Sequence, residues 1–267
     1  MGLKICQITP GLMEIPPKSW GAVEKIIWNY KITFEKLGHQ CDIKYLDEIK
    51  EGEYDIIHIH VANLSIIAKE RGIPHVFSFH DHHAEQADFV KQENLKAING
   101  SDMSFVPGEH LLDFFGRPKN LYYVPHGVDN EKYCLPEKRS FLKHKLLCVG
   151  NNNPHEDRKG FLLAIEAAKR LNLPITIAGP TKNTKTFLDN HPDYLSYSKL
   201  KLELDKSEEE LIKIYQNHTI FIHPSNLEAG HPNLTLLEAS SCGLPVVGTY
   251  KGSNSLSSMY IVNRNVD

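Results

Sequence analysis

The segment of residues 221–249, FIHPSNLEAGHPNLTLLEASSCGLPVVGT, combines two carboxylates with the start of a short helix. Pro232 suits the first turn of that helix, and Gly243 ends it before a second apolar run. Glu228 and Glu238 therefore bracket a helix N-terminus, where unpaired N–H groups attract phosphate. Because the loop after a parallel strand lies in the binding crevice of an open sheet, this segment can hold an anion, sugar hydroxyls and a ribose.

A second group of residues, Arg158 and Lys159, precedes Gly160 at the start of another amphipathic pattern. Cations at the entrance of a helix can bind an anionic group of a ligand. Charge-assisted hydrogen bonds of this kind contribute about 1.5–3 kcal/mol each. The alternative is a solvated Arg-Lys pair in the first turn of a helix, where cations are mildly unfavourable without an anion.

Histidines gather at the predicted ends of two neighbouring strands, namely His58, His60, His80, His82 and His83. Imidazoles in such a cluster can bind zinc or another transition metal. No cysteine or carboxylate set completes a tetrahedral site, so we predict that the chain binds no metal. The sequence also lacks Gly-x-Ser-x-Gly, the phosphate loop of nucleotide hydrolases and a dinucleotide glycine fingerprint near the first strand.

The candidate site residues lie in a sequence in which strand patterns alternate with helix patterns. Apolar runs predict strands over residues 3–9, 41–46, 55–60, 75–79, 103–106 and 122–124, with helical spacing over residues 23–37. A second series starts at Lys145, and residues 128–143 before it lack periodicity. We therefore predict a linker there, with domains over residues 1–140 and 141–267. The alternation predicts an α/β fold with two Rossmann-like, doubly wound parallel-sheet domains that face a cleft.

Composition excludes several classes of protein. The 267 residues are 41% hydrophobic and 24% charged, which is typical of a globular protein. The net charge of −3 offers no broad basic face for nucleic acid. Five cysteines, mostly within apolar runs, favour reduced thiols and a cytoplasmic protein. No apolar run is long enough to span a membrane, so we expect membrane contact that is at most peripheral.

Several segments resemble the retaining glycosyltransferases of family 4, which have the GT-B fold. These segments are PPKSWGAVEKIIWN from Pro16, DIIHIH from Asp55, IPHVFSFHD from Ile73, VPHGVD from Val124, LLEA from Leu236 and GLPVV from Gly243. The resemblance covers nearly the whole chain. It implies transfer of a sugar, with retention, from a UDP- or GDP-linked donor to a carbohydrate, lipid-linked or other hydroxyl acceptor. It also implies that no cofactor is needed, and that the second domain is incomplete because family members continue beyond a point like Asp267.

The resemblance further implies roles for individual residues. Lys159 takes the place of the phosphate-binding lysine, and Arg158 replaces an arginine whose family position is occupied here by Asn151. Glu238 accepts hydrogen bonds from the ribose hydroxyls, and His80 orients the transferred sugar. The remaining residues expected to contact the donor are Gly21, Gly150, Glu228, Gly230, His231, Pro232, Asn233 and Leu234. The two glutamates are separated by nine residues rather than the usual seven, so either the loop has an insertion or Gly230 holds the first position.

Two other functions stay open from the sequence. A nucleotide-sugar epimerase or hydrolase can share this architecture. A degenerate, non-catalytic sugar-nucleotide-binding protein is suggested by Asn151 in place of arginine and by the longer spacing between Glu228 and Glu238.

Overall fold

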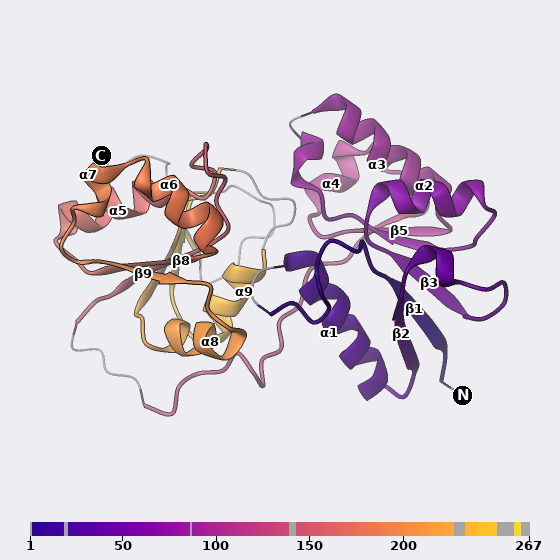
Figure 1. Cartoon of the computed structure of the whole chain (residues 1–267), viewed down its shortest axis with the longest axis horizontal. Coiled ribbons are helices and arrows are strands. Elements are labelled where there is room, and N and C mark those ends of the chain that lie inside the picture. Colours follow the sequence, from indigo (N-terminus) through magenta and orange to yellow (C-terminus); the bar gives the residue numbers. More distant parts are fainter. Residues whose placement is uncertain are drawn as a thin grey trace. The chain divides into compact units, whose positions relative to one another are not determined.

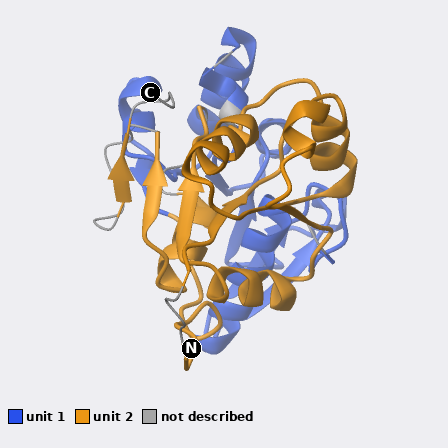
Figure 2. Cartoon of the chain, turned by 90° about the vertical axis from the view of Figure 1, so that its left-hand side faces the viewer, with its two compact units in different colours: residues 1–125, 229–231 blue, residues 126–228, 232–267 orange. Residues whose placement is uncertain are grey.

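The computed structural model describes residues 2–18, 21–85, 87–138, 143–226, 233–249 and 259–262, apart from the side chain of His82 (Figure 1). Contacts between residues divide the chain into two units. Unit 1 comprises the described residues up to Pro125, and unit 2 begins at His126 (Figure 2). This division lies N-terminal to residue 140, where we placed the domain boundary from the sequence.

Unit 1 is built on a parallel sheet with the strand order β2-β1-β3-β4-β5-β6 among the described residues. Its strands are β1 (Lys4–Ile8), β2 (Gln40–Lys44), β3 (Ile56–Ile59), β4 (Val76–Ser78), β5 (Met103–Val106) and β6 (Leu121–Tyr123). Its helices are α1 (Ala22–Lys36), α2 (Ala62–Glu70), α3 (Asp88–Gly100) and α4 (His110–Phe114), with short 3-10 turns η1 (Leu46–Glu48) and η2 (His82–Glu85). Central strands such as β1 are buried along nearly their whole length, which is typical of a parallel sheet covered on both faces.

Unit 2 repeats this plan with the strand order β12-β11-β10-β7-β8-β9, again parallel throughout the described part. Its strands are β7 (Leu146–Val149), β8 (Ile175–Gly179), β9 (Leu200–Leu204), β10 (Ile220–His223), β11 (Val246–Gly248) and β12 (Met259–Ile261). Its helices are α5 (Phe161–Leu171), α6 (Thr186–Asp189), α7 (Pro192–Leu195), α8 (Glu208–Gln216) and α9 (Leu234–Ser241), with a π-helical turn η3 (Thr181–Lys185). The predicted fold class, two Rossmann-like parallel-sheet domains, is confirmed.

Helix α5 shows how the sequence pattern builds the core of unit 2. Its 3.6-residue period places Phe161, Ile165 and Ala168 on one buried face. That face packs in one apolar cluster with Cys148 of β7 and Ile177 of β8. The packing fixes where α5 begins, and therefore where the loop between β7 and α5 lies.

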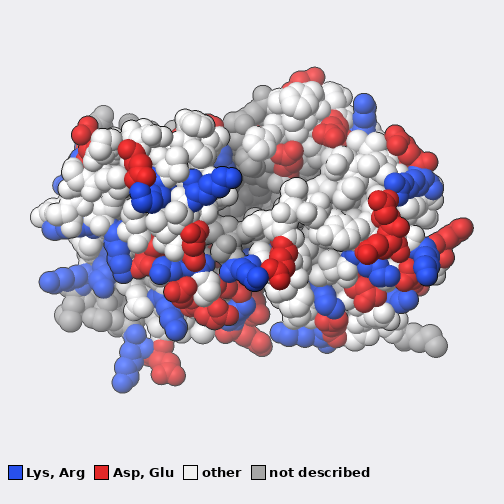
Figure 3. All heavy atoms as spheres, viewed as in Figure 1, with Lys and Arg blue, Asp and Glu red and all other residues white. Residues whose placement is uncertain are grey.

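The surface of the molecule carries charges of both signs. On the face shown in Figure 3, Lys and Arg side chains are intermingled with Asp and Glu side chains. Among the described residues, no helix has the length and apolar character needed to cross a membrane.

Candidate functional site

The loop between β7 and α5 holds a buried lysine. Lys159 is only 8% exposed, and its aliphatic chain lies against Gly150 at the end of β7. A Cβ atom on Gly150 would stand 2.9 Å from Lys159 Cγ, which is closer than carbon atoms approach without displacement. Gly150 thus makes the space that the lysine stem occupies. Both residues were predicted to contact the donor.

Asp157 caps helix α5 from within the same loop. Its carboxylate accepts hydrogen bonds from the backbone N–H groups of Phe161 at 2.7 Å and Leu162 at 3.0 Å. Asn152 donates to Asp157 at 3.1 Å and accepts from the Lys159 N–H at 3.0 Å. These bonds fix the loop and engage the first amides of α5, which are groups that could otherwise bind a phosphate. An anion here must therefore be held chiefly by side-chain cations.

Arg158 joins this loop to the loop that follows β10. The backbone carbonyl of Arg158 accepts hydrogen bonds from the Ser225 hydroxyl at 3.2 Å and the Asn226 N–H at 3.0 Å. Gly160 has φ +72°, and a Cβ atom there would stand 2.5 Å from the carbonyl oxygen of Pro224. Only glycine suits this left-handed conformation and close approach. The two loops are therefore in direct contact at the carboxyl edge of the sheet.

Asn151 and the Arg158 side chain lie together in the β7–α5 loop. The Arg158 guanidinium donates to the carbonyl oxygen of Asn151 at 3.3 Å. The Asn151 side chain accepts a hydrogen bond from Asn183 of η3 at 2.7 Å. Asn151 therefore connects the loops after β7 and β8, and Arg158 is held near the position expected of the family's arginine.

Glu238 lies buried on α9, which begins at Leu234. The side chain of Asn233 caps this helix by accepting the Leu236 N–H at 3.1 Å. Glu238 is 4% exposed and accepts a hydrogen bond from the Tyr215 hydroxyl at 2.9 Å. Glu228, Gly230, His231 and Pro232 lie outside the described residues, so their roles stay predictions.

His80 follows β4 at the carboxyl edge of the sheet in unit 1. Its Nε2 atom lies 3.1 Å from Nδ1 of His60, whose Nε2 lies 2.7 Å from the carbonyl oxygen of the Gln7 side chain. Because that oxygen can only accept, His60 donates through Nε2 and accepts from His80 through Nδ1. Neutral His80 is then protonated on Nε2, with Nδ1 as its acceptor nitrogen.

The histidines of β3 are neutral. His58 Nε2 lies 2.8 Å from the hydroxyl of Ser78, and the His58 ring lies 4.1 Å from that of His60, centroid to centroid. Burial lowers the pKa of His58 to about 3. Burial and the neighbouring imidazoles lower the pKa of His60 well below 6.5. Among the described residues, no group of His, Cys, Asp or Glu is arranged to hold a metal ion.

Gly21 precedes α1 in unit 1, and side chains of its own segment crowd it. A Cβ atom there would stand 2.9 Å from a carboxylate oxygen of Glu24 and 3.1 Å from the sulfur of Met13. Glu24 is buried in the first turn of α1. The close approach explains why this position holds glycine, and its contact with a donor stays a prediction.

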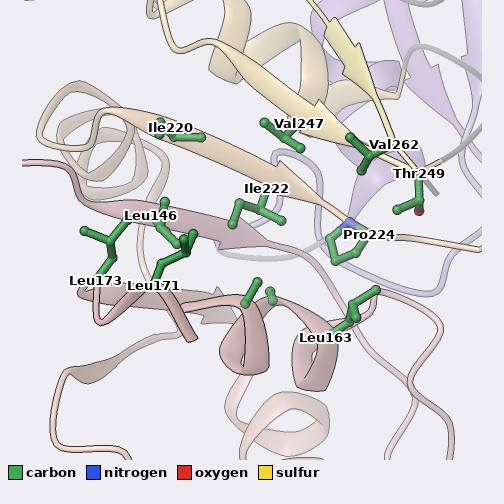
Figure 4. A pocket seen from close by; sticks show the side chains of 12 residues that line it. Leu146, Leu163, Leu171, Leu173, Ile220, Ile222, Pro224, Val247, Thr249 and Val262 are labelled. Atoms are coloured by element: carbon green, nitrogen blue, oxygen red, sulfur yellow. The ribbon is translucent and has the colours of Figure 1, made fainter. Parts of the chain in front are cut away.

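An apolar cavity in unit 2 is distinct from these residues. It has a volume of about 210 Å³ and lies between α5 and the strands β7, β10 and β11 (Figure 4). Its lining comprises Leu146, Leu163, Ala164, Ala167, Leu171, Leu173, Ile220, Ile222, Pro224, Val247, Thr249 and Val262. None of these residues is charged, so the cavity offers no positive side chain to a phosphate.

The structure brings together Lys159, Arg158, Gly150 and Asn151 in one loop, which contacts the loop after β10. Asn233, Leu234 and Glu238 belong to the helix that follows β10, at the same edge of the sheet in unit 2. Gly21 and His80 belong to unit 1. This arrangement defines a protein with two Rossmann-like domains. The second has Arg158, Lys159 and Glu238 in the segments that follow the carboxyl ends of β7 and β10, and ligands of open α/β sheets bind at such an edge.

The sequence comparison finds a similarity that is confined to the C-terminal part of the chain. Residues 138–256 match the family described as glycosyl transferases, group 1, and this segment includes the Lys159 loop, β10 and α9. This segment is therefore similar to a glycosyltransferase group 1 domain. No curated protein has a matching sequence.

Solved structures share the fold of this chain over most of their own length. Sucrose-phosphate synthase from Thermosynechococcus elongatus has a TM-score of 0.73 at 11% identity, over 93% of this chain and 81% of that chain. A glycosyltransferase from Rickettsia africae has a TM-score of 0.68 at 15% identity, over 99% of this chain and 85% of that chain. The catalytic domain of starch synthase IV from Arabidopsis thaliana has a TM-score of 0.67 at 14% identity. This match covers 94% of this chain and 84% of that chain. The likeness establishes the GT-B fold.

Sequence reasoning missed several residues that organise the site. Asp157 has a local signal, since an Asp before Gly160 and an amphipathic run is typical of a helix cap. Tyr215 and Gln7 have none, because their contacts with Glu238 and His60 join segments that are distant in the sequence.

Proposed function

We propose that this chain transfers a sugar from a nucleotide-diphosphate sugar to an acceptor hydroxyl, with retention of anomeric configuration and without a metal. One observation carries the proposal. Within the segment that is similar to a glycosyltransferase group 1 domain, the loop with the buried Lys159 contacts the loop after β10, and the next helix carries the buried Glu238.

The chemical demand is to stabilise the departing diphosphate. Its negative charge grows as the bond to the sugar breaks, and fixed positive charge in a dry site stabilises that transition state. Lys159 is buried and its loop is fixed by Asn152 and Asp157, so little reorganisation is needed during the reaction. We assign Lys159 and Arg158 to the diphosphate.

The sugar nucleotide must also be oriented. A carboxylate suits a vicinal diol because its two oxygens accept from neighbouring hydroxyls, so we assign Glu238 to the ribose. Starch synthase IV, which shares the fold, is bound to ADP and acarbose in its structure. This supports adding ADP-linked sugars to the UDP- and GDP-linked donors expected from the sequence.

In the proposed reaction the acceptor hydroxyl attacks from the side that the diphosphate leaves. The new bond joins the acceptor oxygen to the anomeric carbon, and the bond from that carbon to the diphosphate oxygen breaks. The proton of the hydroxyl passes to that leaving oxygen, so no further carboxylate is needed. We assign His80 to orienting the transferred sugar.

Release of nucleoside diphosphate from UDP-, GDP- and ADP-sugars, with and without an acceptor, tests this function. We expect Lys159→Ala to slow turnover by about 100-fold, the scale of losing one transition-state partner. We expect Glu238→Ala to weaken donor binding by about tenfold. Lys169→Ala is the matched control, because Lys169 is an exposed lysine near the end of α5. Unchanged turnover in both site variants would refute the assignment.

A non-catalytic sugar-nucleotide-binding protein is the second candidate. The observation in its favour is Asn151, which contacts Asn183 where the family has a phosphate-binding arginine. Binding of a nucleoside diphosphate without release from any sugar nucleotide would support it. Release without an acceptor would instead indicate a hydrolase, and a changed sugar would indicate an epimerase.

A further inference from the structure

Asn152 lies in the loop between β7 and α5, and its side chain is buried. It is the second of three consecutive asparagines at residues 151–153, and it is 1% exposed, whereas the asparagines on either side are exposed. Its Nδ2 group donates to Asp157 Oδ1 at 3.1 Å, and its Oδ1 atom accepts from the backbone N–H of Lys159 at 3.0 Å. One amide group therefore joins the residue that caps α5 to the residue that carries the buried cation.

The hydrogen bonds around Asn152 have a fixed polarity. A backbone N–H can only donate, and a carboxylate can only accept. The Lys159 N–H must therefore meet the oxygen of the Asn152 amide, and the Asp157 carboxylate must meet its NH₂ group. The same Oδ1 atom of Asp157 also accepts from the backbone N–H of Phe161 at 2.7 Å. Position 152 thus requires a short side chain that combines an acceptor with a donor, and asparagine has both.

The bond between Asn152 and Asp157 also closes the base of a turn. Between these two residues, Asn153 and Glu156 form an isolated β-bridge, and the Asn153 side chain accepts from the N–H of His155 at 3.0 Å. Most residues of this turn are exposed. Because its two ends are joined, the path of the chain into Lys159 is tied to Asp157 rather than to the conformation of the exposed turn.

The backbone of Lys159 determines where its cation can act. The lysine stem lies against Gly150 and is buried, so a shift of the backbone displaces the whole side chain. Misplacement of a reacting or charge-stabilising group by about 1 Å can slow a reaction by about 100-fold. A group that holds the Lys159 backbone is therefore important for a diphosphate that this lysine meets.

We propose that Asn152 is a positioning residue of the diphosphate site, which holds Lys159 in place by linking its backbone to the carboxylate of Asp157. This inference rests on the proposed function, because it takes Lys159 as a group that meets the diphosphate. Asn152 acts through Lys159 and contacts no ligand itself.

Calorimetric titration of the full chain with ADP, UDP and GDP tests the inference, through the diphosphate that the wild-type protein binds most tightly. We expect Asn152→Ala to weaken binding by about tenfold, the scale of leaving one buried hydrogen-bonding group without its partner. In Lys159→Ala protein the same change should have at most about a twofold further effect, because Asn152 acts through that lysine. Asn153→Ala is the matched control, since it changes the exposed asparagine next in the sequence, and it should keep the wild-type affinity. Circular dichroism checks that each variant is folded at the temperature of the titration.

An exchange of the two side chains separates positioning from a general loss of stability. Asn152→Asp brings two carboxylates together, and Asp157→Asn, whose amide oxygen is needed by Phe161, turns one NH₂ group toward another. Each single variant should therefore weaken binding by about tenfold. The double variant N152D/D157N has the charge of the wild-type protein and again pairs a carboxylate with an amide donor. Its carboxylate can also accept from Lys159, so we expect affinity within about threefold of the wild-type value.

Three results would overturn the inference while the proposed function stands. They are wild-type affinity in Asn152→Ala, an undiminished effect of Asn152→Ala in Lys159→Ala protein, and a double variant that binds no better than the two single variants. If no nucleoside diphosphate binds to the wild-type protein, the proposed function fails and the inference fails with it.

Discussion

Lys159 is a buried lysine, and the absence of a side chain at Gly150 makes room for it. Lysine is seldom buried unless its charge is compensated, and here the stem lies over Gly150 in the same loop as Asp157. Both Lys159 and Asp157 act on the pKa of the Cys148 thiol, so the two charges share one local environment. Asn152 donates to Asp157 and accepts from the Lys159 N–H, so the loop is fixed in a way that suits it to hold an anion at one place.

Gly150→Ala should displace the lysine stem. The added methyl group would stand 2.9 Å from Lys159 Cγ, and this carbon cannot yield as the tip of a flexible chain would. We expect nucleoside diphosphate affinity to fall by about tenfold, measured by titration calorimetry. Gly127→Ala is the control, since a methyl group there meets no atom within 4 Å. Equal affinity in both variants would show that the position of Lys159 does not determine anion binding.

At the scale of single elements, β3 places two neutral histidines inside unit 1. Because burial lowers the pKa of His58 to about 3, the folded chain leaves His58 unprotonated where the unfolded chain binds a proton. This difference favours the folded state above pH 6.5, and the advantage is lost as the pH falls from 6.5 toward 3. His60, with its pKa lowered in the same direction, adds to the effect.

His58→Gln should therefore make unfolding less dependent on pH. Between pH 6.5 and 5, we expect the free energy of unfolding of the variant to fall by about 1 kcal/mol less per pH unit than that of the wild-type protein. Urea denaturation at several pH values measures the slope. His83→Gln, which changes an exposed histidine, should keep the wild-type slope. If the free energy of unfolding of His58→Gln depends on pH as steeply as that of the wild-type protein, His58 is protonated in the folded chain.

The elements differ in how far the sequence predicts them. Helix α5 was predictable because Phe161, Ile165 and Ala168 repeat at helical spacing. Strand β12 was missed because it has only three residues, and Tyr260 and Ile261 within it are exposed. Residues of the site, too, were predictable where a local pattern marks them. Lys159 and Glu238 lie within local motifs, whereas the hydrogen bond from Tyr215 to Glu238 depends on how two helices pack.

At the scale of the whole molecule, the two units have the same plan and separate cores. Each described sheet is parallel and has its own strand order, and the apolar cluster around α5 belongs to unit 2 alone. Repeated alternation of strands and helices is therefore enough to predict that each unit has a parallel sheet, although not every strand of it. The division between the units is harder to predict, because Tyr133 of the connecting segment is buried and bonded to Glu208 of α8.

The two units should respond differently to a nucleoside diphosphate. A ligand that binds only the folded chain stabilises the structure around it by mass action, by about 2.7 kcal/mol at 100 times its Kd. Because Lys159 and Glu238 belong to unit 2, we expect ADP or UDP to slow amide hydrogen exchange in residues 150–160 and in α9. Mass spectrometry of proteolytic peptides measures this, with Lys159→Ala as the control that should show little change. Protection confined to helices α1 to α4 of unit 1 would place the nucleotide in the wrong domain for the proposed reaction.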